Sequence, residues 1–291
     1  MRFSEVSLIV IASSWIRARH DSIAGTMRNP ERQFFEQGWC HFEHDARLLE
    51  WISTALAPAR ASLKDPRHAR WHRCGDTWFA GVNVLPNRND GSIGKGTAIQ
   101  GKAIEFINSR LGLRDFALDA GQVSVCFPGY PQPMPDETAA SACYRRERDA
   151  AHVDGLLPEG LTRRRHLREV HSFILGIPLV EFDAHAAPFV VWEKSHELMR
   201  RVFKKRFAGI PADQWGEQDV TAVYHAARRQ VFETCKRVEI HARPGEAFIA
   251  HRLVLHGIAP WRDGAVAGED GRMICYFRPE AFGVEEWLGR P

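Results

Sequence analysis

Residues 243–260 read RPGEAFIAHRLVLHGIAP and carry the clearest structural signal in the chain. Gly245 and Glu246 predict a turn, and the apolar run that follows predicts a buried strand over residues 246–255. This strand would bring His256 to its end, directly before Gly257. We therefore expect a functional histidine where a buried strand ends.

Similar short runs, rich in β-branched and aromatic residues, occur on both sides of this stretch. They predict strands over residues 121–127, 172–180, 188–192, 238–242 and 272–277. Helical spacing predicts helices over residues 195–207 and 219–235, and further helices nearer the N-terminus over residues 45–63 and 97–113. Asp45 is a plausible cap for the first of these, and residues 76–85 predict one more strand.

Helices first and many strands later predict an α+β chain with a β-sandwich or barrel core. Two polar stretches, residues 131–149 and 155–169, are expected to be inserted loops. Arg168 and His171 lie between residue 154 and the next predicted strand, where an ordinary loop and a contact to an acidic substrate both remain open.

The composition excludes several classes of protein. The chain has 291 residues, is 44% hydrophobic and carries a formal net charge of only +3. Its basic clusters, one over residues 163–168, have no interleaved aromatic residues, which argues against a nucleic-acid groove. Six scattered cysteines form no CxxC pair, so we expect reduced thiols in a cytoplasmic protein.

The N-terminus holds an apolar run at residues 7–12 that is too short to span a membrane. It could be a weak export signal or part of an extended N-terminus. We expect residues 1–26 to be a poorly ordered extension and residues 27–291 to form a single domain.

The tripeptide His152-Val153-Asp154 has the spacing of two metal ligands. Residues i and i+2 of a strand point to the same face, so both side chains can reach one ion. A second histidine from a distant strand would complete a set of two histidines and one carboxylate, which suits iron(II) and leaves coordination positions open. His256 and His251 are the candidates for this third ligand.

With these motifs in order, the chain resembles the phytanoyl-CoA dioxygenase family of 2-oxoglutarate-dependent oxygenases. The resemblance rests on His152-Val153-Asp154, on Lys194-Ser195-His196, on residues 245–257 with His256-Gly257 at their end, and on Arg272. The opening run at residues 34–39 also looks like the start of that family's domain.

The resemblance implies a double-stranded β-helix (a jelly-roll, cupin-like core) flanked by N-terminal helices. It implies that His152, Asp154 and His256 hold iron(II) and are the catalytic centre. It also implies that Arg272 binds the far carboxylate of 2-oxoglutarate, with Arg262 as a rival at shorter spacing. An intact aspartate in the ligand set points to hydroxylation, with release of succinate and CO2.

The expected partner is a small-molecule substrate, with no nucleic acid and no membrane, for a monomer or a homodimer. A different class of function remains open, namely a non-catalytic barrel that binds a metal or a small ligand. Arg272 separates the two, because an inward arginine without a carboxylate partner would be a costly buried charge.

Overall fold

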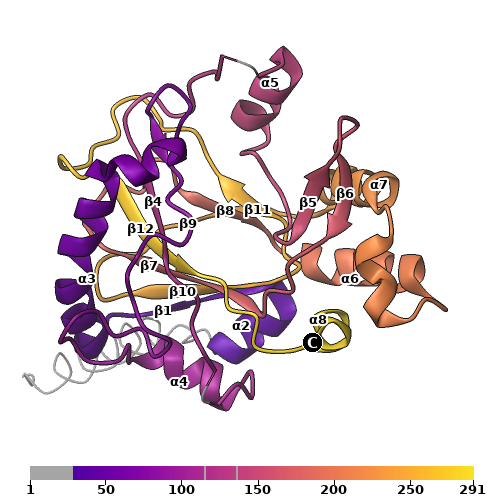
Figure 1. The fold of residues 1–291 in the computed structure, drawn as a ribbon, viewed down its shortest axis with the longest axis horizontal. Helices are drawn as coiled ribbons and strands as arrows, with labels where there is room; N and C mark the ends of the chain where they lie inside the picture. Colours follow the sequence, from indigo (N-terminus) through magenta and orange to yellow (C-terminus); the bar gives the residue numbers. More distant parts are fainter. Residues whose placement is uncertain (1–28, 115, 136) are drawn as a thin grey trace, which may run out of the picture.

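The structure, a computed structural model, describes residues 29–114, 116–135 and 137–291. Its largest feature is a seven-stranded antiparallel sheet with the order β1-β10-β7-β12-β4-β3-β2 (Figure 1). In this order the strands are Trp39–Phe42, Ala247–His251, Phe173–Pro178, Arg272–Phe277, Gln122–Cys126, Trp78–Phe79 and His72–Arg73.

A three-stranded antiparallel sheet faces the larger one, with the order β11-β8-β9. Its strands are His256–Ile258, Phe189–Trp192 and Arg237–Ile240. Side chains of both sheets meet in one buried cluster, where Phe189 of the small sheet lies 5.0 Å from Phe248 and 5.7 Å from Tyr276 of the large sheet, between ring centroids. The predicted double-stranded β-helix, with helices flanking a two-sheet core, is therefore the observed architecture.

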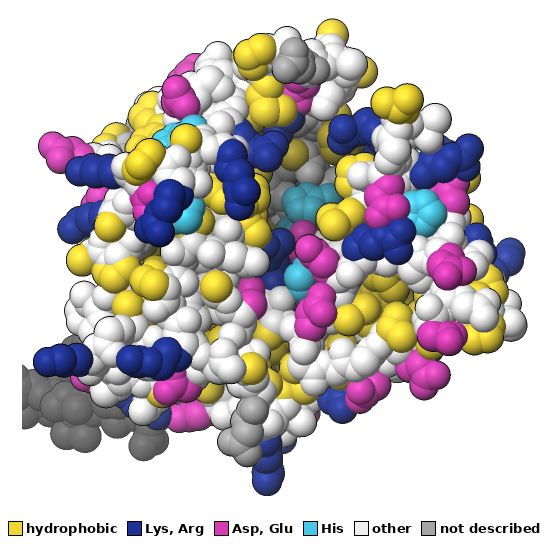
Figure 2. Space-filling view, viewed as in Figure 1, with side chains coloured by type: hydrophobic (Ala, Val, Ile, Leu, Met, Phe, Trp, Pro, Cys, Tyr) yellow, Lys and Arg dark blue, Asp and Glu magenta, His cyan; other side chains and the backbone are white. Residues whose placement is uncertain are grey.

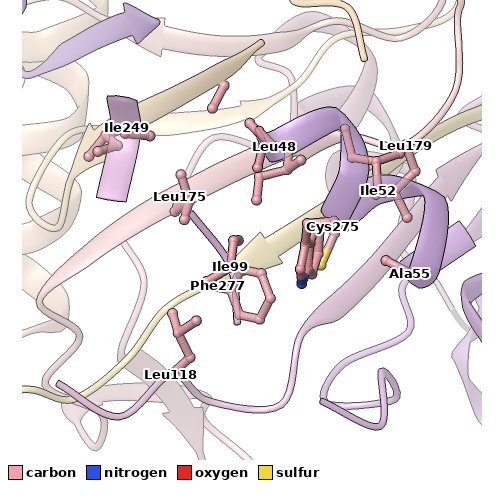
Figure 3. Close-up of a cluster of buried hydrophobic side chains, with 14 of the residues drawn as sticks. Leu48, Ile52, Ala55, Ile99, Leu118, Leu175, Leu179, Ile249, Cys275 and Phe277 are labelled. Carbon is pink, nitrogen blue, oxygen red and sulfur yellow. The ribbon is translucent and has the colours of Figure 1, made fainter. Parts of the chain in front are cut away.

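Strand β12 shows how alternation builds the two sides of the large sheet. Its residues Ile274 and Tyr276 point between the sheets, whereas Cys275 and Phe277 point to the other side. There they pack against Leu48 and neighbouring residues of α3 (Ala46–Lys64), as Figure 3 shows. Both sides of β12 are buried, which explains its nearly continuous apolar sequence.

Helices cover the outer sides of the sandwich. The helices α2 (Pro30–Gln37), α3 and α4 (Lys102–Ser109) lie on the large sheet, and α6 (Ser195–Phe207) and α7 (Thr221–Thr234) pack together beside the small sheet (Figure 1). The remaining elements are α5 (Ala139–Glu147), α8 (Val284–Gly289), two 3-10 helices (Pro66–Trp71 and Ala212–Glu217) and a separate hairpin, β5 (Leu156–Glu159) with β6 (Arg164–Leu167).

Several predicted elements differ from the structure. The strand expected over residues 246–255 ends at His251, and the chain turns and enters the small sheet at His256. The strand expected over residues 76–85 shrinks to Trp78–Phe79, and the helix expected over residues 97–113 to Lys102–Ser109. Each expected loop contains regular structure, α5 in the first and the β5–β6 hairpin in the second. Long-range packing decides these boundaries, which local patterns cannot register.

Other expectations are confirmed. Asp45 caps α3, and its side chain accepts a hydrogen bond from the backbone N–H of Arg47. All six cysteines are free. The proposed boundary at residues 26 and 27 lies outside the described residues. Among the described residues, no helix has the length and apolar character needed to cross a bilayer.

Candidate metal centre

The two segments that carry the predicted ligands are joined through their backbones. His152 and His256 form an isolated antiparallel bridge, in which each N–H donates to the other residue's carbonyl, at 2.8 and 3.0 Å between N and O. His256 also pairs with Val191 of β8, so the small sheet holds the ligand segment in place. His152 is thus paired to the edge strand of the small sheet, whereas Asp154 lies in the turn that follows, so the His-x-Asp tripeptide makes no regular strand.

The structure brings the side chains of His152, Asp154 and His256 together. One ligand atom from each lies within 4.8 Å of the others. Asp154 Oδ1 is 3.1 Å from His152 Nε2 and 3.6 Å from His256 Nε2. Bonds of about 2.0–2.2 Å to a shared ion would set neighbouring ligand atoms about 3 Å apart, so the spacing fits one metal.

Backbone carbonyls determine which imidazole nitrogens face the centre. Nδ1 of His152 lies 3.0 Å from the carbonyl oxygen of Ala150, and Nδ1 of His256 lies 3.0 Å from that of Val254. A carbonyl accepts only, so each Nδ1 must carry a proton and donate it. In the neutral imidazole, Nε2 is then left with a lone pair directed at the centre, which is the orientation that metal-binding histidines use.

Three acceptors therefore converge on one point: two imidazole nitrogens and a carboxylate oxygen. Acceptors at these distances repel one another unless a cation lies between them. Asp154 is only 8% exposed, while the His152 side chain is 45% exposed and opens the centre to one side. The three ligand atoms and their spacing fit an iron(II) ion that is bound on one side by these residues and has open coordination positions on the other.

Asp154 is kept as a carboxylate by its surroundings. Burial alone would raise its pKa, but the charge of Arg278, together with the two histidine rings when they are protonated, outweighs this effect and holds the pKa well below its ordinary value. Arg278 Nη1 lies 3.4 Å from Oδ2, the oxygen opposite the histidines. Arg278 was not singled out from the sequence, although strand alternation places it on the same side of β12 as Arg272 and Tyr276.

His251, the rival ligand, lies elsewhere. It is fully buried, its Nε2 lies 2.9 Å from Arg200 Nη2, and its Nδ1 accepts from the backbone N–H of Leu253 at 3.0 Å. Its ring centroid lies 5.7 Å from that of Phe34 of α2, with the rings tilted at 41°, on the outer side of the large sheet. Among the described residues, the metal-type cluster contains His256 and excludes His251.

Arg272 is fully buried between the sheets. Its Nη2 donates to the hydroxyl of Tyr276 at 3.0 Å, and its Nε and Nη1 have no hydrogen-bond partner among the described residues. Arg262 is different, because it pairs with Glu239 and His185 and its side chain is 47% exposed.

A cavity of about 260 Å³ adjoins the three candidate ligands. Figure 2 shows a hollow in this face of the molecule, with histidine and basic side chains in it. The walls of the cavity include several aromatic side chains: Trp71, Trp78, Tyr130, Phe189 and Tyr276. Arg272 does not line the cavity itself, but it contacts Tyr276, which does. An apolar cavity with a few polar groups at one end is the usual form of a small-molecule site.

Comparisons with known proteins give weak likenesses. No protein-family model and no curated protein matches the chain. Among solved structures, the chain is similar to SnoK, a non-heme alpha ketoglutarate dependent carbocyclase from nogalamycin biosynthesis, with 14% identity over 87% of this chain and 83% of the other and a TM-score of 0.46. EctD from S. alaskensis with bound Fe is 13% identical over 87% and 77%, with a TM-score of 0.40. HygX from Streptomyces hygroscopicus, with nickel and 2-oxoglutarate bound, is 12% identical over 89% and 90%, with a TM-score of 0.38.

Proposed function

We propose that this chain is an iron(II)- and 2-oxoglutarate-dependent dioxygenase that hydroxylates a small molecule. The observation that carries the proposal is the convergence of His152 Nε2, His256 Nε2 and an Asp154 carboxylate oxygen on one point beside a cavity. When bound there, iron(II) would supply open coordination positions and the redox chemistry for dioxygen, while 2-oxoglutarate is oxidised to succinate and CO2 and one oxygen atom enters the substrate.

The chain's own residues would do three things. His152, Asp154 and His256 would hold the metal, with Arg278 and two backbone carbonyls fixing the carboxylate and the rings. The aromatic walls of the cavity would exclude water from the reacting groups. Arg272, with the hydroxyl of Tyr276, would bind the far carboxylate of 2-oxoglutarate.

Arg272 favours this function over a non-catalytic binding barrel. A guanidinium with two unpaired nitrogens inside the core is costly, and a dianionic co-substrate would neutralise it. The order of the motifs supports the finer assignment to a phytanoyl-CoA dioxygenase-like enzyme, and the cysteine pattern supports a cytoplasmic location.

An anaerobic titration tests the proposal. Iron(II) and then 2-oxoglutarate are added to the metal-free protein, and the visible charge-transfer band of the ternary complex is followed. We expect a band in the wild type. Arg272→Gln should weaken 2-oxoglutarate binding about tenfold or more, because a charge-assisted pair is lost, without weakening iron(II) binding.

Arg262→Gln is the matched control, since Arg262 lies in a surface ion pair, and its band should form at the wild-type concentration of 2-oxoglutarate. Absence of a band in the wild type would contradict the proposed function. An unchanged affinity in Arg272→Gln would remove Arg272 from the co-substrate site.

A further inference from the structure

A second cavity, of about 330 Å³, lies on the other side of the candidate metal ligands. It shares His152, Asp154 and Arg278 with the first cavity, so the metal centre lies in the wall between the two. Helices α5 and α7, the β5–β6 hairpin and the segments on either side of this hairpin supply the rest of its lining. Four arginines line it, Arg145, Arg165, Arg228 and Arg278, whereas the first cavity has two arginines and five Trp, Tyr or Phe side chains in its walls.

Arg165 of β6 and Arg228 of α7 both line this cavity, and neither has a carboxylate within ion-pair distance among the described residues. Arg165 Nη1 donates to the backbone carbonyl of Leu156 at 2.7 Å. The Arg228 guanidinium lies over two aromatic rings, 4.5 Å from the centroid of Tyr144 and 5.4 Å from that of Tyr224. Burial lowers the pKa of Arg165, and so does the nearby charge of Arg228.

The neighbours of Arg165 on the same hairpin behave differently. Arg164 is exposed and pairs with Asp219, and Arg168 is exposed and pairs with Glu159. Arg164 and Arg168 are thus neutralised by carboxylates, while Arg165 is not. Surface solvation therefore explains Arg164 and Arg168 but does not explain Arg165.

The few acidic groups at this cavity are already engaged. Asp154 belongs to the metal centre, and Glu169 binds His171 at 2.9 Å between Oε2 and Nε2. Arg278 also reaches the cavity, and its Nε has no partner among the described residues. Arg165, Arg228 and the Nε atom of Arg278 thus face a cavity in which no carboxylate is available to pair with them.

The position of the arginines is tied to the metal ligands. The backbone N–H of Val153, between the two ligands of the His-x-Asp tripeptide, donates to the hydroxyl of Tyr224 at 3.1 Å. Tyr224 in turn lies against Arg228. An anion bound by Arg228 would therefore lie in the same cavity that His152 and Asp154 line.

We propose that this second cavity binds an anionic group, a carboxylate or a phosphate, of the molecule to be oxidised, through Arg165, Arg228 and Arg278. The proposal rests on the proposed function and adds a substrate class to it. It assigns the substrate's anion to a site separate from Arg272, which is left for the co-substrate. Planar guanidinium groups recognise both carboxylates and phosphates through paired hydrogen bonds.

The test measures anion binding by the full chain without metal or 2-oxoglutarate. Metal-free protein in EDTA is titrated with inorganic phosphate, and in a second arm with acetate, at constant ionic strength set with KCl. The rise of the unfolding midpoint gives the apparent Kd. Phosphate binding in the wild type would indicate a phosphorylated substrate, and acetate binding a carboxylate. No binding of either anion would overturn the proposal.

Matched variants locate the anion. Arg165→Gln and Arg228→Gln should each weaken binding about tenfold, because each removes a charge-assisted hydrogen bond. Arg164→Gln and the exposed Arg229→Gln, each one residue away, should keep the wild-type Kd. Weakening by Arg272→Gln with no change in Arg165→Gln and Arg228→Gln would place the anion in the co-substrate site and overturn the proposal.

Chemical footprinting of arginines in the wild-type protein tests the proposal even if a variant does not fold. Phenylglyoxal modifies arginine side chains, and peptide mass spectrometry reads the rate at each position. Saturating anion should slow modification of Arg165 and Arg228 severalfold and leave Arg229 unchanged, and equal rates would overturn the proposal. Because these measurements contain no iron, their failure is separate from failure of the iron and 2-oxoglutarate titration.

Discussion

Gly257 controls how closely the two ligand-bearing segments approach. A Cβ atom at this position would lie 2.1 Å from the backbone oxygen of Asp149 and 3.3 Å from the Cα atom of Ala151. Only a hydrogen fits there, which gives a physical reason for the glycine directly after His256. A side chain would push β11 away from the segment that carries His152.

We therefore predict that Gly257→Ala weakens metal binding about tenfold or more, since residues that position ligands typically contribute 10- to 100-fold to metal affinity. Anaerobic calorimetric titration with cobalt(II) measures the effect. Gly268→Ala is the control, because a Cβ atom there meets nothing within 4 Å. Equal cobalt(II) affinities for the two variants would show that this close approach does not position the ligands.

At the scale of secondary structure, one carboxylate connects two helices. Asp45 caps α3 through the backbone N–H of Arg47, and it also accepts from the backbone N–H of Lys102, the first residue of α4, at 3.1 Å. The side-chain hydrogen bond from Arg47 is the main cause that lowers the pKa of Asp45 to about 2. These contacts hold α3 and α4 together on the outer side of the large sheet.

Asp45→Asn should lower the free energy of unfolding by about 1 kcal/mol at pH 7, because neutral hydrogen bonds replace charge-assisted ones. A carboxyl whose folded-state pKa is depressed stabilises the protein above its unfolded-state value, near 3.9, and loses this effect as pH falls toward 2. Urea unfolding from pH 7 to pH 3 should thus show the difference between wild type and variant shrinking below about pH 4. A constant difference over this range would contradict the assigned role of the charge.

On the scale of the whole molecule, the candidate metal centre joins parts of the chain that are distant in sequence. His152 and Asp154 follow α5, whereas His256 begins β11 of the small sheet. Three convergent acceptors without a cation repel one another, so metal binding should stabilise the fold as well as the site.

We predict that cobalt(II) at about 100 times its Kd raises the midpoint of thermal unfolding by about 5 °C or more, as expected for a ligand that binds only the folded state. His256→Ala should abolish this rise. His251→Ala should keep it while lowering the starting midpoint, because His251 is buried with Arg200 and Phe34. Loss of the rise in His251→Ala alone would reassign the third ligand to His251.

The sequence by itself determined the strand over residues 272–277, the cap at Asp45 and the types of residue that could bind a metal. These follow from the local period of a strand or helix and from the chemistry of single side chains. The two-residue period of a strand could also have identified Arg278 from the sequence, since it places Arg278 on the same side as Arg272 and Tyr276.

Only the tertiary structure decided which histidine joins His152 and Asp154. The run over residues 246–255 looks like one strand, yet it turns after His251, and His256 enters the other sheet. Likewise, the basic cluster over residues 163–168 leaves a solvated surface and an anion-binding patch both open in the sequence, and folding turns Arg165 toward the second cavity. Strand exchange between sheets and the direction of a hairpin side chain depend on contacts between segments far apart in the chain, which local periodicity does not encode.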